Sequence, residues 1–353
     1  MSAVCKVFLD PEISLFSCDR VKSNGCSMVF VSIVDTALLR GRKLCFAGAR
    51  CDLQTNSDQL AELLDRLSVP TAASGSAHFT MRVVVDESLN EAAGKPHFRG
   101  LHHVVTASFG ESNVFVFDIL RRTLSARVSG EVAGDCRFWT EKLIPIALGV
   151  LGAAMGLVPV HCACLESDGN GLLVAGVSGA GKSTLSVALS EAGFRYVSDD
   201  WTYISQTSDG IVAHGTSAPV KLLPDAAMHF QNLQGRSLQI SMNGELAYEI
   251  DIATTFGVAT RRECEPRWLL FLERMKENGA ELTPISSTAA RSYVSSSVER
   301  LPAQLCEAAA LREQTIERVA RLPCWRFRYG GTPQFAAQQL MKFIVDRKQE
   351  IYA

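Results

Sequence analysis

The sequence lacks most of the features that would place it directly in a functional class. Its net charge is only −2 over 353 residues, so bulk charge predicts no binding to nucleic acid or to an anionic membrane surface. It has no internal repeat, low-complexity tract or coiled-coil pattern, and its composition is not that of a disordered chain. It does have 47% hydrophobic residues, enough for a sizeable core, and a length typical of about two domains.

The 11 cysteines also lack a pattern, because no two of them have the C-x₂-C spacing typical of a zinc site. The N-terminus lacks the basic and apolar regions of a signal peptide, so we expect a reduced, cytoplasmic protein. Cys162 and Cys164 are two positions apart on an expected strand and therefore face the same side of it. We interpret them as small apolar core residues, with a redox or metal role as the alternative.

One stretch lacks charge altogether: residues 143–160 form an uncharged run of 18 positions, close to the length that spans a bilayer. The run contains several glycines and prolines and continues directly into an expected strand. We interpret it as a buried helix that ends near Gly156, and we expect no membrane association. A membrane-spanning helix is the alternative.

A phosphate-binding motif is the strongest positive feature of the chain. Residues 176–183, GVSGAGKS, fit the pattern G-x-x-x-x-G-K-[ST] without a mismatch. An apolar strand pattern at 172–175 precedes the motif, and a helical pattern at 182–192 follows it. This order suits phosphate binding, because glycines let backbone N–H groups turn toward phosphate oxygens and a helix N-terminus adds partial positive charge.

The loop predicts binding of ATP with Mg²⁺. Lys182 is expected to reach the β- and γ-phosphates, and the Ser183 hydroxyl is expected to ligate Mg²⁺. The predicted nucleotide-binding residues are Gly176, Val177, Ser178, Gly179, Ala180, Gly181, Lys182, Ser183 and Thr184. A glycine-rich turn that binds nothing is the alternative.

The strand before the loop predicts a second site residue. A turn pattern at 167–171 joins strand patterns at 160–166 and 172–175, which predicts an antiparallel hairpin. If the centre of its turn lies between Asp168 and Gly169, position 161 is opposite position 176. This register would bring His161 close to the γ-phosphate, whereas a lone histidine on a strand is normally a core residue.

A pair of carboxylates follows the helix. Residues 193–200 read as a strand that ends in Asp199 and Asp200. Its end should face the crevice in which open α/β sheets bind ligands. Adjacent side chains on a strand point to opposite faces, so at most one of them is easily aimed at the phosphate, to hold Mg²⁺ or to accept a proton from a hydroxyl. A polar turn is the alternative.

The remaining patterns describe the two expected domains, 1–135 and 136–353. The first carries no chemical motif and is predicted to be a β-rich α+β domain, with a helix at 58–67 capped by Asn56 or Ser57 and strands at 28–34, 78–85, 104–109, 114–119 and 124–128. The second should also contain a strand at 267–273, a helix at 307–322, a half-buried strand at 325–329 and a helix from 332 onward. Arg236, Arg261 and Arg262 could reach phosphates, although a surface position is favoured for each.

The order and spacing of His161, the turn at 168–169, the loop at 176–183 and the pair Asp199–Asp200 resemble the catalytic domain of the HPr kinase/phosphorylase family. The match covers residues 158–203. It implies an α/β fold with the phosphate-loop core of phosphoenolpyruvate carboxykinase, an antiparallel hairpin before that loop, and an ATP- and Mg²⁺-dependent kinase acting on a serine of a protein or peptide.

The resemblance also implies residue roles. By position, Lys182 and Ser183 match the nucleotide and Mg²⁺ residues, and His161 matches a histidine at the transferred phosphate. Asp199 matches the base toward the acceptor hydroxyl, and its neighbour Asp200 is expected to be a metal ligand.

One signature of the family is missing, because Glu249-Ile250-Asp251 lacks the Arg-Gly of a Glu-x-Arg-Gly motif. This departure argues against phosphorylase activity and against HPr as the substrate. We expect residues 1–135 to select the acceptor. Related enzymes are often oligomers, although the sequence shows no self-association motif. The alternatives are a nucleotide-binding regulator without transfer activity and a small-molecule kinase.

Overall fold

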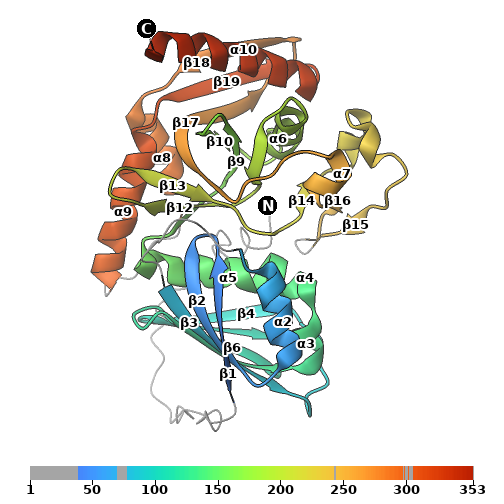
Figure 1. Ribbon diagram of the computed structural model, residues 1–353, viewed down its shortest axis with the longest axis vertical. Coiled ribbons are helices and arrows are strands. Elements are labelled where there is room, and N and C mark those ends of the chain that lie inside the picture. The colour runs from blue at the N-terminus through green and yellow to red at the C-terminus, as the bar shows by residue number, and fades with distance from the viewer. Residues whose placement is uncertain are drawn as a thin grey trace. The chain divides into compact units, whose positions relative to one another are not determined.

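The computed structural model describes residues 39–69, 78–241, 244–296, 298, 301 and 305–352. The expected strand at 28–34 lies outside the described residues. The described chain forms two compact units, each with its own sheet (Figure 1). The first unit ends at Leu157 and the second begins at Val158, and the start of α9 (Cys306–Ala320), up to Arg312, groups with the first unit. This division lies after the boundary we expected at residue 135.

The first unit is built on a mixed seven-stranded sheet with the order β1-β2-β3-β7-β6-β5-β4. The neighbours β2, β3 and β7 run parallel, and the other pairs are antiparallel. Four strands match the predicted ones: β3 (His78–Asp86), β5 (Val104–Phe109), β6 (Asn113–Asp118) and β7 (Thr123–Ser129). Three were not predicted: β1 (Arg40–Phe46), β2 (Ala49–Thr55) and β4 (Pro96–Leu101).

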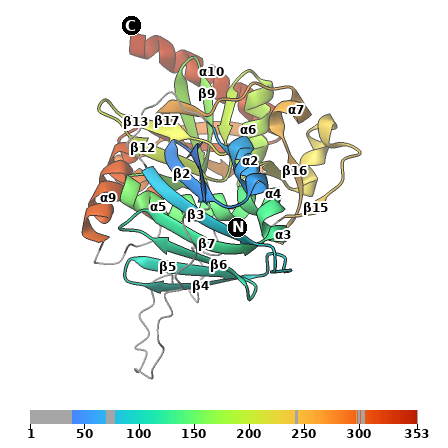
Figure 2. The ribbon, with the colours of Figure 1, turned by 60° about the horizontal axis from the view of Figure 1, so that its bottom comes forward.

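The predicted helix of this unit, α2 (Asp58–Leu67), is confirmed together with its cap. The Ser57 side chain accepts a hydrogen bond from the Leu60 backbone N–H at 3.3 Å, which satisfies one of the free donors at the helix start. Leu60, Leu63 and Leu64 are buried, and α2 contacts β1 and β2. Figure 2 shows α2 beside β2. An apolar stripe at helical spacing therefore fixes which side of α2 faces the sheet.

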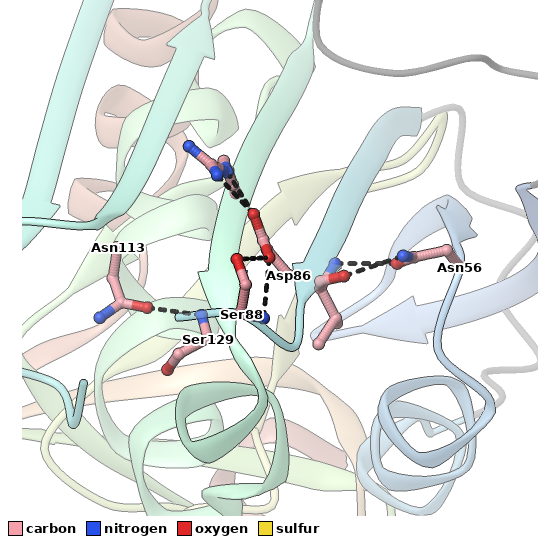
Figure 3. A network of polar contacts seen from close by, with 7 residues as sticks. Asn56, Asp86, Ser88, Asn113 and Ser129 are labelled. Atoms are coloured by element: carbon pink, nitrogen blue, oxygen red, sulfur yellow. Dashed lines mark hydrogen bonds and ion pairs between the residues drawn. The ribbon is translucent and has the colours of Figure 1, made fainter. Parts of the chain in front are cut away.

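A polar network ties the strand ends of the first unit together (Figure 3). The Asn56 side chain follows β2, accepts from the Val85 N–H at 2.8 Å and donates to the Val85 carbonyl at 2.9 Å. The Asn113 Oδ1 atom accepts from the Ser129 N–H at 2.9 Å, which joins β6 to the end of β7. Because these side chains bond to backbone, we assign the network a structural role.

The apolar run becomes a continuous helical segment in the first unit. It consists of α4 (Cys136–Phe138), η2 (Trp139–Leu143), α5 (Ile144–Gly152) and η3 (Ala153–Met155), after the short helix α3 (Gly130–Gly134). As predicted, it ends at Gly156, which has a left-handed φ of 71°. Among the described helices, Cys136–Met155 alone is long and apolar enough to cross a membrane, but 72% of its most apolar window is buried, as in the core helix of a soluble protein.

The second unit contains a nine-stranded sheet with the order β11-β9-β10-β17-β13-β12-β8, extended by β19 and β18 beside β17. A separate three-stranded sheet has the order β14-β16-β15. The strands are β8 (Val158–Val160), β9 (Cys162–Ser167), β10 (Asn170–Ala175), β11 (Arg195–Ser198), β12 (Thr202–Gln206), β13 (Ile211–His214), β14 (Val220–Leu222), β15 (Gln239–Ile240), β16 (Leu246–Ile250), β17 (Glu263–Arg274), β18 (Gly279–Pro284) and β19 (Cys324–Gly330).

Strand direction brings four strand ends to one edge of this sheet. β10, β17 and β19 are parallel, and β11 runs in the same direction because both β11 and β10 pair antiparallel with β9. The chain therefore leaves β10 into the phosphate loop at the same edge at which β11 ends before Asp199. The carboxyl edge of parallel strands is where α/β sheets bind ligands.

Helices cover both faces of the sheet. Alternate residues of the hairpin, such as Leu165 and Val174, pack with α6 (Lys182–Glu191) and α10 (Pro333–Tyr352). The intervening residues, Cys162 and Cys164 among them, pack with α8 (Ser287–Ser296) and with the C-terminal part of α9. The two cysteines thus lie on one side in the core, as predicted. The remaining short helices are η4 (Pro224–Met228), η5 (Gln231–Leu233) and α7 (Ile252–Phe256).

Candidate functional site

A cavity of about 220 Å³ lies at the carboxyl edge of the second unit's sheet. Five predicted site residues line it: His161, Lys182, Ser183, Asp199 and Asp200. Of the other predicted loop residues, Ser178, Gly179, Gly181 and Thr184 also line the cavity. Gly176 and Ala180 are buried and Val177 is exposed, and these three do not line it. The structure therefore brings the loop, the histidine and both carboxylates to one place.

The predicted hairpin is present with the predicted register. Ala175 lies opposite Cys162, so the next positions along the two chains are Gly176 and His161. His161 occupies a break between β8, which pairs with β12, and β9, which pairs with β10. The break allows the histidine to line the cavity at the end of the strand that precedes the loop.

Two glycines of the phosphate loop adopt a backbone conformation that other residues rarely adopt. Gly179 and Gly181 have φ angles of 81° and 90°, in the left-handed region that disfavours side chains. A Cβ at Gly181 would also lie 2.6 Å from the Tyr329 hydroxyl oxygen, whereas a Cβ at Gly179 would meet nothing within 4 Å. Gly181 is therefore required for two reasons, backbone conformation and space.

Lys182 begins helix α6 and turns its side chain back over the loop. Its ammonium nitrogen Nζ donates to the Gly176 carbonyl at 2.9 Å and to the Val177 carbonyl at 3.4 Å. Only 8% of the residue is exposed, so these carbonyls hold a buried positive charge beside the cavity.

The two carboxylates have opposite environments. Burial raises the pKa of Asp199 to about 6; a hydrogen bond with the Ser183 side chain opposes this shift, and the charge of Asp200 adds to it. The Asp199 Oδ1 atom is buried and has no hydrogen-bond partner among the described residues. An unpaired carboxylate oxygen with a pKa near neutrality is suited to accept a proton.

Asp200 is held as a carboxylate instead. Its Oδ1 atom lies 3.1 Å from the His161 Nε2 atom. Burial acts to raise the pKa of Asp200, but the hydrogen bond from His161 and the charges of His161, Lys182 and Lys221 together lower it. The residue has a φ of 63°, a conformation that side chains rarely adopt and that occurs often at functional sites.

Sequence reasoning missed other charged residues at the cavity. Lys221 on β14 and Arg274 at the end of β17 both line it. The Arg274 guanidinium carbon lies 4.5 Å from the centre of the Tyr329 ring. The signal that could have found Arg274 is its place at the carboxyl end of a strong core strand.

The arginines considered from the sequence lie elsewhere. Arg236, Arg261 and Arg262 do not line the cavity. Arg236 donates to the Asn232 carbonyl at 2.9 Å, and Arg261 is one of two arginines near the buried Glu166. The surface position favoured for these three residues holds, because all three are exposed.

Glu166 stabilises the hairpin turn from within. It is 0% exposed, and one of its oxygens lies 3.0 Å from Arg195 and 3.8 Å from Arg261. Its other oxygen accepts from the Gly169 backbone N–H in the turn. A buried carboxylate of this kind requires its cationic partners.

The cavity suits a Mg²⁺ ion that is bound jointly by the protein and by the phosphates of a substrate. No group of three or more His, Cys, Asp or Glu side chains in the described part of the chain could hold a metal ion on its own. Mg²⁺ usually takes one or two protein oxygens together with substrate phosphates and water. The Ser183 hydroxyl and the ionised Asp200 supply oxygens of the required kind beside the phosphate loop.

Comparison with known proteins finds similarity over part of the chain. No protein-family model matches. Over 101 residues, 29% of the chain, the sequence is 33% identical to the HPr kinase/phosphorylase of Lachnoclostridium phytofermentans, and the match spans only 27% of that protein's length. The resemblance to the HPr kinase family is therefore confirmed for part of the chain.

Among solved structures, the HPr(Ser) kinase/phosphatase from Coxiella burnetii aligns with 55% of this chain and 99% of its own, at 14% sequence identity. The TM-score is 0.29, which is too low to bear on the fold.

Proposed function

We propose that the chain is an ATP- and Mg²⁺-dependent kinase that transfers the γ-phosphoryl group to a hydroxyl, that of a serine in a protein or peptide. The observation that carries the proposal is a single cavity lined by the phosphate-loop lysine, the loop serine and two carboxylates with oppositely shifted pKa values. Pairs of acids whose environments separate their pKa values are typical of acid–base sites.

The loop would bind the triphosphate. Its backbone N–H groups and the start of α6 offer partial positive charge, and Lys182 adds a full charge next to the Gly176 and Val177 carbonyls. Because phosphoryl transfer depends mainly on positioning and charge stabilisation, this arrangement supplies the larger part of what the reaction needs.

Asp199 would act as the base. The acceptor oxygen attacks the γ-phosphorus while its proton passes to Asp199 and the bond to the bridging oxygen of the β-phosphate breaks, releasing ADP. The raised pKa of Asp199 keeps its proton affinity close to that required near neutral pH.

Asp200 and Ser183 would hold Mg²⁺, which neutralises phosphate charge when bound. The lowered pKa of Asp200 keeps it ionised for this role. When both ring nitrogens of His161 carry a proton, Nε2–H donates to Asp200 and Nδ1–H would donate toward the moving phosphoryl group in the same cavity.

A protein or peptide acceptor is proposed from the partial match to HPr kinase/phosphorylase. The missing Glu-x-Arg-Gly motif favours an acceptor other than HPr and a reaction in the forward direction only. We propose that the first unit selects this acceptor.

Transfer of label from γ-³²P-ATP in a cell extract tests the proposal. Label in protein supports it, label in a metabolite supports a small-molecule kinase, and retained ATP without transfer supports a regulator.

Lys182→Ala and Asp199→Asn should abolish transfer without unfolding the protein. Lys276→Ala, which removes an exposed lysine outside the cavity lining, should leave transfer unchanged. Full transfer by Asp199→Asn would refute its role as the base.

A further inference from the structure

A tyrosine from a distant helix binds both backbone groups of the first residue of the phosphate loop. The Gly176 N–H donates to the Tyr293 hydroxyl at 3.0 Å, and the same hydroxyl donates to the Gly176 carbonyl at 3.0 Å. A hydroxyl has one proton to donate and lone pairs to accept with, so it can make both bonds at once. Neither the motif nor the family resemblance indicates Tyr293.

Gly176 needs such a partner because of its place in the chain. β10 ends at Ala175, and the ladder of sheet hydrogen bonds ends with it. Backbone groups that leave a ladder in a buried region require other partners. Tyr293 supplies them from α8, and its ring is packed edge-on against Phe271 with the centroids 4.6 Å apart. Phe271 pairs with Ala175 in the sheet, so the hydroxyl is held in place by the strand next to the loop.

The Gly176 carbonyl connects this contact to the charge that the loop presents. The carbonyl accepts from Tyr293 at 3.0 Å and from the Lys182 ammonium at 2.9 Å. The orientation of one peptide group therefore determines where the Lys182 Nζ atom lies. Because glycine has the widest conformational freedom of any residue, this peptide group depends on outside contacts to keep one orientation.

We propose that Tyr293 is a positioning residue for the phosphate loop. It acts through Gly176 and Lys182, does not touch the nucleotide, and preorganises the loop for the triphosphate. The inference rests on the proposed binding of Mg²⁺·ATP. Preorganisation raises affinity because less conformational freedom is lost on binding.

Calorimetric titration of Mg²⁺·ATP into the full-length protein tests the inference. Tyr293→Phe keeps the ring but removes the hydroxyl, and it should weaken binding about tenfold, which corresponds to about 1.4 kcal/mol. Hydrogen exchange should also become faster at the Gly176 amide, which loses its acceptor. Ser296→Ala is the matched control, because it removes from α8 a hydroxyl that donates to the Tyr293 carbonyl at 2.7 Å and not to the loop.

The outcomes separate the two proposals. Weaker binding by Tyr293→Phe but not by Ser296→Ala, with similar melting temperatures for both variants, supports positioning, since a purely structural role would change melting and not affinity. Wild-type affinity in Tyr293→Phe would overturn the inference and leave the proposed function standing. A wild-type protein that does not bind Mg²⁺·ATP would overturn both.

Discussion

The Nε2 atom of His161 lies 3.1 Å from the Oδ1 atom of Asp200. The two residues come from opposite sides of the phosphate loop in the sequence, one at the break between β8 and β9 and the other just after β11. The contact lowers the pKa of Asp200 against the effect of its burial, and it orients the imidazole ring at the cavity. The pair thus links the residue proposed at the moving phosphoryl group to a proposed metal ligand.

Replacing this histidine should affect catalysis more than binding. In His161→Asn, kcat for phosphoryl transfer should fall about 100-fold, since a positioned hydrogen-bond donor contributes about that much to a transition state. Affinity for Mg²⁺·ATP should change less than about threefold. Rapid-quench measurement of transfer and calorimetric titration separate the two effects.

A matched control lies in the first unit. His103→Asn alters a half-exposed histidine whose Nε2 atom is 3.9 Å from Asp118, and it should leave kcat unchanged. Wild-type kcat in His161→Asn would contradict the assigned role.

The pKa of Asp199 predicts how stability depends on pH. Because its folded pKa is raised from 3.8 to about 6, the folded protein binds a proton more tightly than the unfolded chain does. The stability that this group contributes is complete below pH 3.8 and is lost as pH rises through about 6. Between pH 5 and pH 7 the nucleotide-free wild type should therefore lose about 1 kcal/mol relative to Asp199→Asn. Urea unfolding of both proteins across this range measures the difference, and parallel pH profiles would disprove the prediction.

The two left-handed glycines of the loop should differ in their tolerance of a methyl group. Gly179→Ala and Gly181→Ala share the cost of a left-handed alanine, about 1–2 kcal/mol. Gly181→Ala should be clearly the less stable of the two, because its Cβ would meet the Tyr329 hydroxyl oxygen at 2.6 Å. Thermal denaturation without nucleotide ranks them.

Removing the Tyr329 hydroxyl should restore stability to the Gly181→Ala variant. In Gly181→Ala/Tyr329→Phe, the nearest remaining atom of residue 329 would be the ring carbon Cζ, 3.9 Å from the new Cβ. The double variant should recover most of the difference between the two alanine variants. If it does not, the Tyr329 hydroxyl is not the cause of the extra loss of stability in Gly181→Ala.

The buried Glu166 makes one surface-facing arginine important for stability. Arg195→Ala should lower the free energy of unfolding by about 3 kcal/mol, because it leaves the fully buried carboxylate with the more distant Arg261 as its one cationic partner among the described residues. Arg267→Ala breaks an exposed pair, with Glu265, at the same distance of 3.0 Å, and should cost less than about 1 kcal/mol. Equal losses in denaturant unfolding would show that the burial of Glu166 is not what makes Arg195 matter.

The sequence predicted those parts of the site that depend on local patterns. The loop, the hairpin register that places His161 beside Gly176, and the strand leading to Asp199 all follow from residues close together in the chain. The turn residues determine the register of the hairpin, and an apolar run identifies a strand and therefore the loop or carboxylate that follows it. Local sequence is sufficient for these features.

Residues that reach the site through the fold could not be found in this way. Arg274, Lys221 and Tyr293 come from segments that pair with or pack against the loop region only in three dimensions. Arg274 depends on β10 and β17 being parallel neighbours, and Tyr293 depends on α8 covering the face that carries Phe271. No motif marks these positions, because a lone arginine or tyrosine in a sequence is usually explained by surface or core packing.

The pairing of β9 with β10 limits where this chain can accept inserted residues. His161 precedes β9, and β10 leads into the phosphate loop. The number of residue pairs between the turn and the far end of the hairpin therefore determines the positions of both His161 and Gly176. A residue added to only one strand would slide the imidazole away from Gly176 and turn every following side chain to the opposite face of the sheet. Insertions are therefore tolerated in this hairpin only when both strands lengthen together or when the extra residues stay in the turn.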